Sequence, residues 1–121
     1  SVHYETGKKL FPLREEGVLV IGSGNLVHNL HSYSWGDPDA PPYDWTVRFE
    51  DQVKDLILKG EDEKLVSYKD LGPDAARSVP TPDHYLPLLY VLGLRGKDEK
   101  VSFPVEGVDG GSVSMLSIRI G

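Results

Sequence analysis

Two stretches of the chain repeat apolar side chains at helical spacing. Residues 3–15 carry apolar positions among glutamates and lysines, and Gly17 follows as a helix stop, so we expect a short surface helix there. Residues 44–59 repeat apolar side chains at helical spacing up to Gly60, with Asp44 as the expected N-cap. The second stretch therefore predicts an amphipathic helix with one face in the core.

The segment that begins at Thr81 combines several helix-start signals. Thr81 is an N-cap residue, a proline follows it and an acid occupies the first turn, so a helix is expected to run to Gly93. Pro87 removes a backbone donor and predicts a kink or a tightened first turn. His84 would then occupy the third helical position, where the helix dipole favours a neutral imidazole. Residues 61–80 are polar with scattered apolar anchors, which predicts short helical turns and loops.

Strand patterns are found after the first predicted helix and near the C-terminus. Residues 18–21 are continuously apolar, as in a strand that is covered on both faces of a parallel sheet. Residues 26–33 could open a helix, which the prolines of residues 36–43 would end in a surface loop. Residues 100–107 and 112–120 are expected strands, joined by a glycine-rich turn. We therefore expect an α/β fold with a mostly parallel or mixed central sheet flanked by helices.

The amino-acid composition narrows the chemistry open to this chain. Its 121 residues fit one domain, and its net charge of −6 disfavours nucleic acid as a partner, because phosphate backbones are bound chiefly by clustered Lys and Arg. No apolar run is long enough to span a bilayer and no signal peptide is visible, so we expect a soluble, cytoplasmic protein without a membrane partner. The chain has no cysteine, so a metal must be bound by His, Asp or Glu.

The sequence VLVIGSGNLVHNL, residues 18–30, joins an apolar run to a glycine-rich segment. It lacks the third glycine of a dinucleotide fingerprint, the lysine of a P-loop and the spacing of a nucleophile elbow. A glycine-rich turn after a buried strand delivers the next residues to the carboxyl edge of the sheet, where α/β proteins bind ligands. His28 is therefore expected near the mouth of a site.

Four histidines are candidates for function. On local grounds His28 is either a hydrogen-bonded structural residue or a functional one. His31 could share a helix face with His28 and form a metal-binding pair, although a solvated side chain explains it equally well. His84 is either a neutral ligand or base at a helix N-terminus, or a first-turn residue facing water. His3 lies on a polar helix and is expected at the surface.

Three ordered motifs of the chain resemble one known family. GVLVIGSGNLVHNL, PTPDHYLPLLYVLG and FPVEGVDGGSVSMLSIRIG look like the C-terminal half of the DODA-type extradiol ring-cleavage dioxygenases. These form the LigB-like family that includes the bacterial and plant 4,5-DOPA extradiol dioxygenases. The likeness covers nearly the whole chain, including HYETGKKLFPLREEG ahead of the first motif. It implies a three-layer α/β domain with a non-heme metal centre that opens catechols next to, not between, their hydroxyls.

The resemblance also implies roles for two of the histidines. The motif histidines fall on His28 and His84, and by analogy with the LigB branch His84 is a metal ligand. His28 is either an acid/base that takes a proton from the catechol hydroxyl or a further ligand. The metal would be Fe(II) for catalysis, which can bind both catechol oxygens and dioxygen, or Zn(II), with which several relatives are recorded. No role carries over to His31, where relatives often have arginine.

The resemblance places the family's other metal histidines in an N-terminal half that this sequence does not contain. Residues 1–121 are therefore expected to be the C-terminal portion of a single catalytic domain, inactive alone, with exposed strand edges and apolar faces. The expected partners are a small aromatic diol, O2 and that N-terminal half. Two other functions stay open: a catalytically silent α/β domain that binds a small aromatic acid or a partner, and a metal-dependent hydrolase with His28 as its base.

Overall fold

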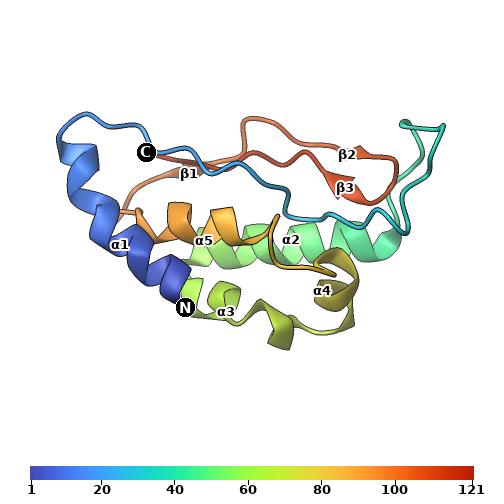
Figure 1. Cartoon of the computed structure of the whole chain (residues 1–121), viewed down its shortest axis with the longest axis horizontal. Coiled ribbons are helices and arrows are strands. Elements are labelled where there is room, and N and C mark those ends of the chain that lie inside the picture. The colour runs from blue at the N-terminus through green and yellow to red at the C-terminus, as the bar shows by residue number, and fades with distance from the viewer.

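The computed structural model describes all 121 residues, and its helices and strands form separate layers (Figure 1). The helices are α1 (Val2–Glu15), α2 (Asp44–Lys59), α3 (Asp62–Val66), the 3-10 helix η1 (Tyr68–Leu71), α4 (Pro73–Ser78) and α5 (Leu86–Gly93). The strands are β1 (Val101–Ser102), β2 (Val108–Asp109), β3 (Val113–Ser114) and β4 (Arg119–Ile120). In Figure 1 the strands and the extended segment after α1 lie above α5 and α2.

Helix α2 forms where its apolar spacing predicted it and supplies one side of the core. The apolar side chains of its inner face are buried: Trp45, Phe49, Val53, Leu56 and Ile57. Gly60 adopts a left-handed conformation with φ 71° and ends the helix, as glycine does readily. Asp44 is not the N-cap that was predicted, because it is the first helical residue and Tyr43 occupies the cap position. The carboxylate still lies in the first turn, where the helix dipole favours it.

Helices α1 and α5 pack against each other at two glycines. A side chain on Gly7 would clash with the carbonyl oxygen of Tyr90, and one on Gly93 would clash with that of Tyr4. The two backbones therefore approach more closely than any other residue would permit. Helix α1 confirms the prediction for residues 3–15, and the short helices α3, η1 and α4 confirm the prediction of helical turns before α5.

The helix predicted from Thr81 begins later, at Leu86. The residues before it form a turn in which the N–H groups of Tyr85 and Leu86 both donate to the carbonyl of Pro82. Pro87 falls in the first helical turn, where a missing N–H has no intrahelical partner to lose, so no kink is required. The N–H of Leu88 donates to the carbonyl of Tyr85, three residues earlier, which is the tightened first turn that was the predicted alternative. His84 precedes the helix and does not occupy the third helical position that was predicted.

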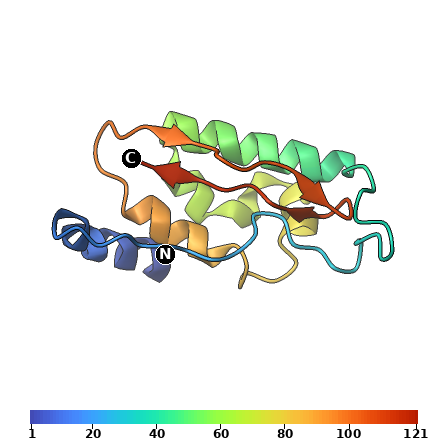
Figure 2. The ribbon, with the colours of Figure 1, turned by 90° about the horizontal axis from the view of Figure 1, so that it is seen from above.

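The parallel strand predicted at residues 18–21 does not form. The segment is extended, but the N–H and C=O groups from Leu19 to Gly24 make no hydrogen bond within the chain. The side chains of Leu19 and Ile21 are 81% and 79% exposed. Seen from above in Figure 2, this blue segment runs over α5, apart from the orange and red strands over α2. The segment therefore exposes unpaired backbone groups along its edge and two large apolar side chains.

Both strand pairs are antiparallel, which corrects the expected mostly parallel or mixed central sheet. β1 pairs with β4, with Val101 opposite Ile120, and β2 pairs with β3, with Val108 opposite Ser114. β1, β3 and β4 fall within the predicted strands, whereas β2 lies in the predicted turn. One helical layer and one strand layer are present, and the expected third layer is not seen (Figure 1). None of the helices has the length and apolar character that crossing a membrane requires.

Candidate functional site

The segment that carries His28 runs along β3 and is not the helix predicted for residues 26–33. His28 forms an antiparallel bridge with Val113 of β3. Its N–H donates to the carbonyl of Ser78, at the end of α4, at 2.9 Å. Pairing with a strand that is distant in the sequence satisfies the backbone groups that a helix would have used. The backbone of His28 is thereby fixed between the strand layer and the helical layer.

The two glycines before His28 permit close packing and do not form the tight turn that was predicted. Neither has a φ in the left-handed region. A Cβ on Gly22 would lie 2.9 Å from the carbonyl oxygen of Pro87, and one on Gly24 would clash with that of His84. The absence of side chains therefore lets the extended segment lie directly against α5 and the turn before it.

His84 lies in the turn between α4 and α5, which is held on both sides. Its carbonyl accepts a hydrogen bond from the N–H of Asn25 at 3.0 Å. The next residue, Tyr85, is fully buried, and its hydroxyl donates to the carbonyl of Leu65 at 2.9 Å. Burial raises the pKa of the Tyr85 phenol, so this group stays a donor at neutral pH. The backbone of His84 therefore has neighbours that restrict its movement on two sides.

The rings of His28 and His84 stack on one another. Their centroids are 3.6 Å apart and their planes differ by 16°. Burial of His28 lowers the pKa of its imidazole, and the neighbouring His84 lowers it further. The carboxylate of Asp83, which lies 3.3 Å from Nε2 of His84, acts in the opposite direction on His28. A neutral imidazole is the form that binds a metal or accepts a proton.

The structure brings together the two histidines that carry the family motifs and leaves the other two apart. Nδ1 of His3 lies 3.0 Å from the hydroxyl of Tyr90, and the two rings meet edge to face. His31 is exposed, and the helix that would have paired it with His28 is absent. The stack of His28 and His84 is a feature of the structure. Their roles as metal ligand or acid/base stay predictions.

The stacked imidazoles fit part of a metal site. Imidazole nitrogens suit both Fe(II) and Zn(II), so the donor type agrees with the metals that the resemblance implies. The chain assembles no group of three or more His, Cys, Asp or Glu side chains that could hold an ion. Catalytic sites of these metals generally use three protein ligands. The two histidines therefore offer a partial ligand set within residues 1–121.

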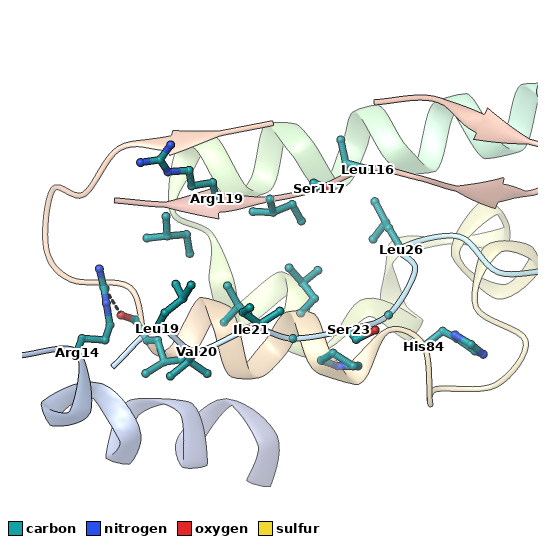
Figure 3. A pocket seen from close by; sticks show the side chains of 18 of the residues that line it. Arg14, Leu19, Val20, Ile21, Ser23, Leu26, His84, Leu116, Ser117 and Arg119 are labelled. Carbon is teal, nitrogen blue, oxygen red and sulfur yellow. Dashed lines mark hydrogen bonds between the residues drawn. The ribbon is translucent and has the colours of Figure 1, made fainter. Parts of the chain in front are cut away.

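A groove of about 540 Å³ begins at His84. The extended segment Val18–Gly24 forms one side, residues 116–120 form the other, and side chains of α5 lie between them. Figure 3 shows Leu19, Val20 and Ile21 along one side, Leu116, Ser117 and Arg119 along the other, and His84 at one end. The sequence did not predict this groove, because the apolar run at its edge was expected to be covered on both faces.

Comparison with known proteins identifies the family. Residues 1–116 match the family described as the catalytic LigB subunit of aromatic ring-opening dioxygenase. The chain belongs to this family. It is 48% identical to the 4,5-DOPA dioxygenase extradiol of Escherichia coli (strain K12), over 98% of the chain and 44% of that relative. It is 33% identical to the 4,5-DOPA dioxygenase extradiol of Portulaca grandiflora, over 97% of the chain and 43% of that relative.

A solved structure shares the fold of this LigB-family chain. The crystal structure of an uncharacterized protein from Escherichia coli K12 matches it with a TM-score of 0.88 and 45% sequence identity. The match covers 98% of this chain and 49% of the solved chain. The family predicted from the three motifs is therefore confirmed. The chain spans less than half the length of these curated relatives.

Proposed function

We propose that this chain is part of an extradiol dioxygenase that opens a catechol-type, DOPA-like ring with O2 at a non-heme metal centre. Membership of the LigB family and the names of the relatives support the reaction class. The stack of His28 and His84 carries the proposal, because two residues far apart in the sequence come together there and His84 also lines the end of a largely apolar groove. Apolar clefts with a few polar groups are typical sites for small molecules.

In this proposal the two histidines have different tasks. His84 is a metal ligand. One ring nitrogen of His28 accepts the proton of a catechol hydroxyl. The lowered pKa of His28 keeps its ring neutral at pH 7, which is the form with a free nitrogen for that proton. A role for His28 as a further ligand needs the same neutral ring. Bound Fe(II) would supply a centre that takes both the catechol oxygens and O2, and Zn(II) is the alternative ion.

We infer that the rest of the catalytic domain completes the ligand set and covers the groove. This chain gathers no three-ligand group, and it spans less than half the length of the curated relatives. The free N–H and C=O groups from Leu19 to Gly24 are able to pair with a further strand, and the exposed Leu19 and Ile21 side chains would be buried by helices packed over it.

The partial ligand set favours one other function, a catalytically silent α/β domain that binds a small aromatic acid. The groove is mostly apolar, and Arg119 at its edge would pair with a carboxylate. No feature of the structure favours a metal-dependent hydrolase over these two functions.

Anaerobic loading with Fe(II), followed by addition of DOPA or catechol and oxygen, tests the proposal on the protein in its longest natural form. Ring opening gives a yellow semialdehyde that is followed by its absorbance. His84→Ala should lose both bound iron and activity. His28→Ala should keep the iron and lose kcat if His28 is the acid/base, and should lose iron if it is a ligand.

His31→Ala is the matched control, because it removes an exposed imidazole from the same segment. It should change neither iron content nor rate. An unmodified protein that binds one iron per chain and yet forms no yellow product would reject the dioxygenase and favour the silent binding domain.

A further inference from the structure

Gly24 and Asn25 lie where the segment of His28 crosses the turn of His84. We propose that Gly24 and Asn25 are positioning residues that set the distance between the rings of His28 and His84. The proposal rests on the proposed function only for its effect on catalysis, since the contacts themselves require no particular reaction. Neither residue belongs to the histidine pair that the family motifs identify.

Asn25 connects three parts of the fold. Its N–H donates to the carbonyl of His84 at 3.0 Å, and its Nδ2 donates to the carbonyl of Ser114, in β3, at 2.8 Å. Ser114 is itself buried, and its Oγ donates to Glu50 of α2 at 2.5 Å. One residue therefore links the His84 turn to the strand layer and, through Ser114, to the longest helix.

Gly24 determines how close the two segments lie. A Cβ at this position would clash with the carbonyl oxygen of His84 and would lie 3.1 Å from Cγ of Pro87. The first of these atoms belongs to the backbone and has no free rotation by which to move aside. The φ of Gly24 is outside the left-handed region, so the residue is needed for spacing and not for an unusual backbone angle.

The contacts of Gly24 and Asn25 with the His84 turn affect the ring stack because other contacts hold the backbone of His28 in place. Its bridge to Val113 and its hydrogen bond to Ser78 do not involve the His84 turn. A displacement of that turn therefore changes the distance between the rings and does not carry both rings together. At a reacting centre, misplacement by about 1 Å is enough to reduce a rate by roughly 100-fold.

Proton NMR on the metal-free protein in its longest natural form measures the stack. Each stacked ring shields the protons of the other, so the ring signals of His28 and His84 should lie upfield of those of exposed His31. His28→Gln and His84→Gln assign the signals. Asn25→Asp keeps the side-chain size but removes the Nδ2 donor, and Gly24→Ala introduces the clash. Both variants should move the paired ring signals downfield.

Asn29→Asp is the matched control. Nδ2 of Asn29 donates to the carbonyl of Arg77 at 2.8 Å, so the same substitution removes a bond of the same kind and length away from the His84 turn and keeps the oxygen that accepts from the N–H of Ser32. The stack signals should stay in place. In the iron-loaded protein, Asn25→Asp and Gly24→Ala should lower kcat by roughly 10- to 100-fold with little change in the KM of the catechol. The control should change kcat by less than about twofold.

Unshifted ring signals in either folded variant, or equal shifts in the Asn29→Asp control, would overturn the proposal. If neither variant folds, hydrogen exchange in the unmodified protein decides: slow exchange of the Asn25 backbone and side-chain amides supports the proposal, and fast exchange contradicts it. If the signals shift as expected while the unmodified protein forms no yellow product, the positioning role stands and the dioxygenase function fails.

Discussion

Tyr85 ties the His84 turn to the helical core, and removal of its hydroxyl should destabilise the fold measurably. The side chain is fully buried, its hydroxyl donates to the carbonyl of Leu65 at 2.9 Å, and its ring centroid lies 4.3 Å from that of Tyr68. Tyr85→Phe keeps the ring contact and deletes only the hydrogen bond. Losing this bond and leaving a desolvated carbonyl should lower the free energy of unfolding at pH 7 by about 1–3 kcal/mol.

The pKa of Tyr85 predicts how this difference changes with pH. Burial raises the pKa of the phenol above its ordinary value of 10.0, so above pH 10 the native state retains a proton that the unfolded state releases. The stability that this group contributes is complete below pH 10 and is lost as the pH rises. At pH 11 the loss is about 1.4 kcal/mol, and Tyr85→Phe does not suffer it. The pKa of Tyr4, which burial raises to about 12, affects both proteins equally.

Urea unfolding at pH 7 and pH 11, followed by circular dichroism, measures both effects. Tyr43→Phe is the control, because the hydroxyl of Tyr43 also donates to a carbonyl, that of Ser32, at 2.8 Å. Tyr43 is 38% exposed, so water replaces the lost partner and the change should stay within about 0.5 kcal/mol. Equal losses for the two variants at pH 7, or a Tyr85→Phe difference as large at pH 11 as at pH 7, would refute the reasoning.

Two further changes test the contacts of α1. Arg14 donates two hydrogen bonds of 2.6 Å to Glu99, and these lower the pKa of that carboxyl. Glu99→Gln should lower the free energy of unfolding by about 1 kcal/mol at pH 7. This difference should disappear as the pH falls from 4.5 through the lowered pKa of Glu99, because the carboxylate is then protonated. Urea unfolding between pH 2 and 7 measures it. Gly93→Ala places a methyl group against the carbonyl of Tyr4 and should lower stability by about 1–3 kcal/mol; an unchanged melting temperature would contradict the close packing of α1 and α5.

Local signals predicted the helices best where one face meets the core. The spacing of apolar residues in α2 and the glycine after it were enough to place that helix, because its hydrogen bonds join residues four positions apart. The start of α5 was misplaced, because the N–H groups of Tyr85 and Leu86 bond to Pro82 in a turn instead of continuing a helix from Thr81. The signals at Thr81 are genuine local preferences that this turn uses differently.

The sequence alone determined the family and the two histidines that the motifs carry, because these depend on residue identity and order. Only the tertiary structure decided that residues 18–21 lie exposed beside a groove, that His28 is in a strand-like segment paired with β3, and that its ring stacks on His84. A strand forms only if a partner supplies hydrogen bonds across its edge, and that partner is distant in the chain or outside it. The apolar side chains of residues 18–21 indicate that burial would be favourable, whereas the fold determines what covers them.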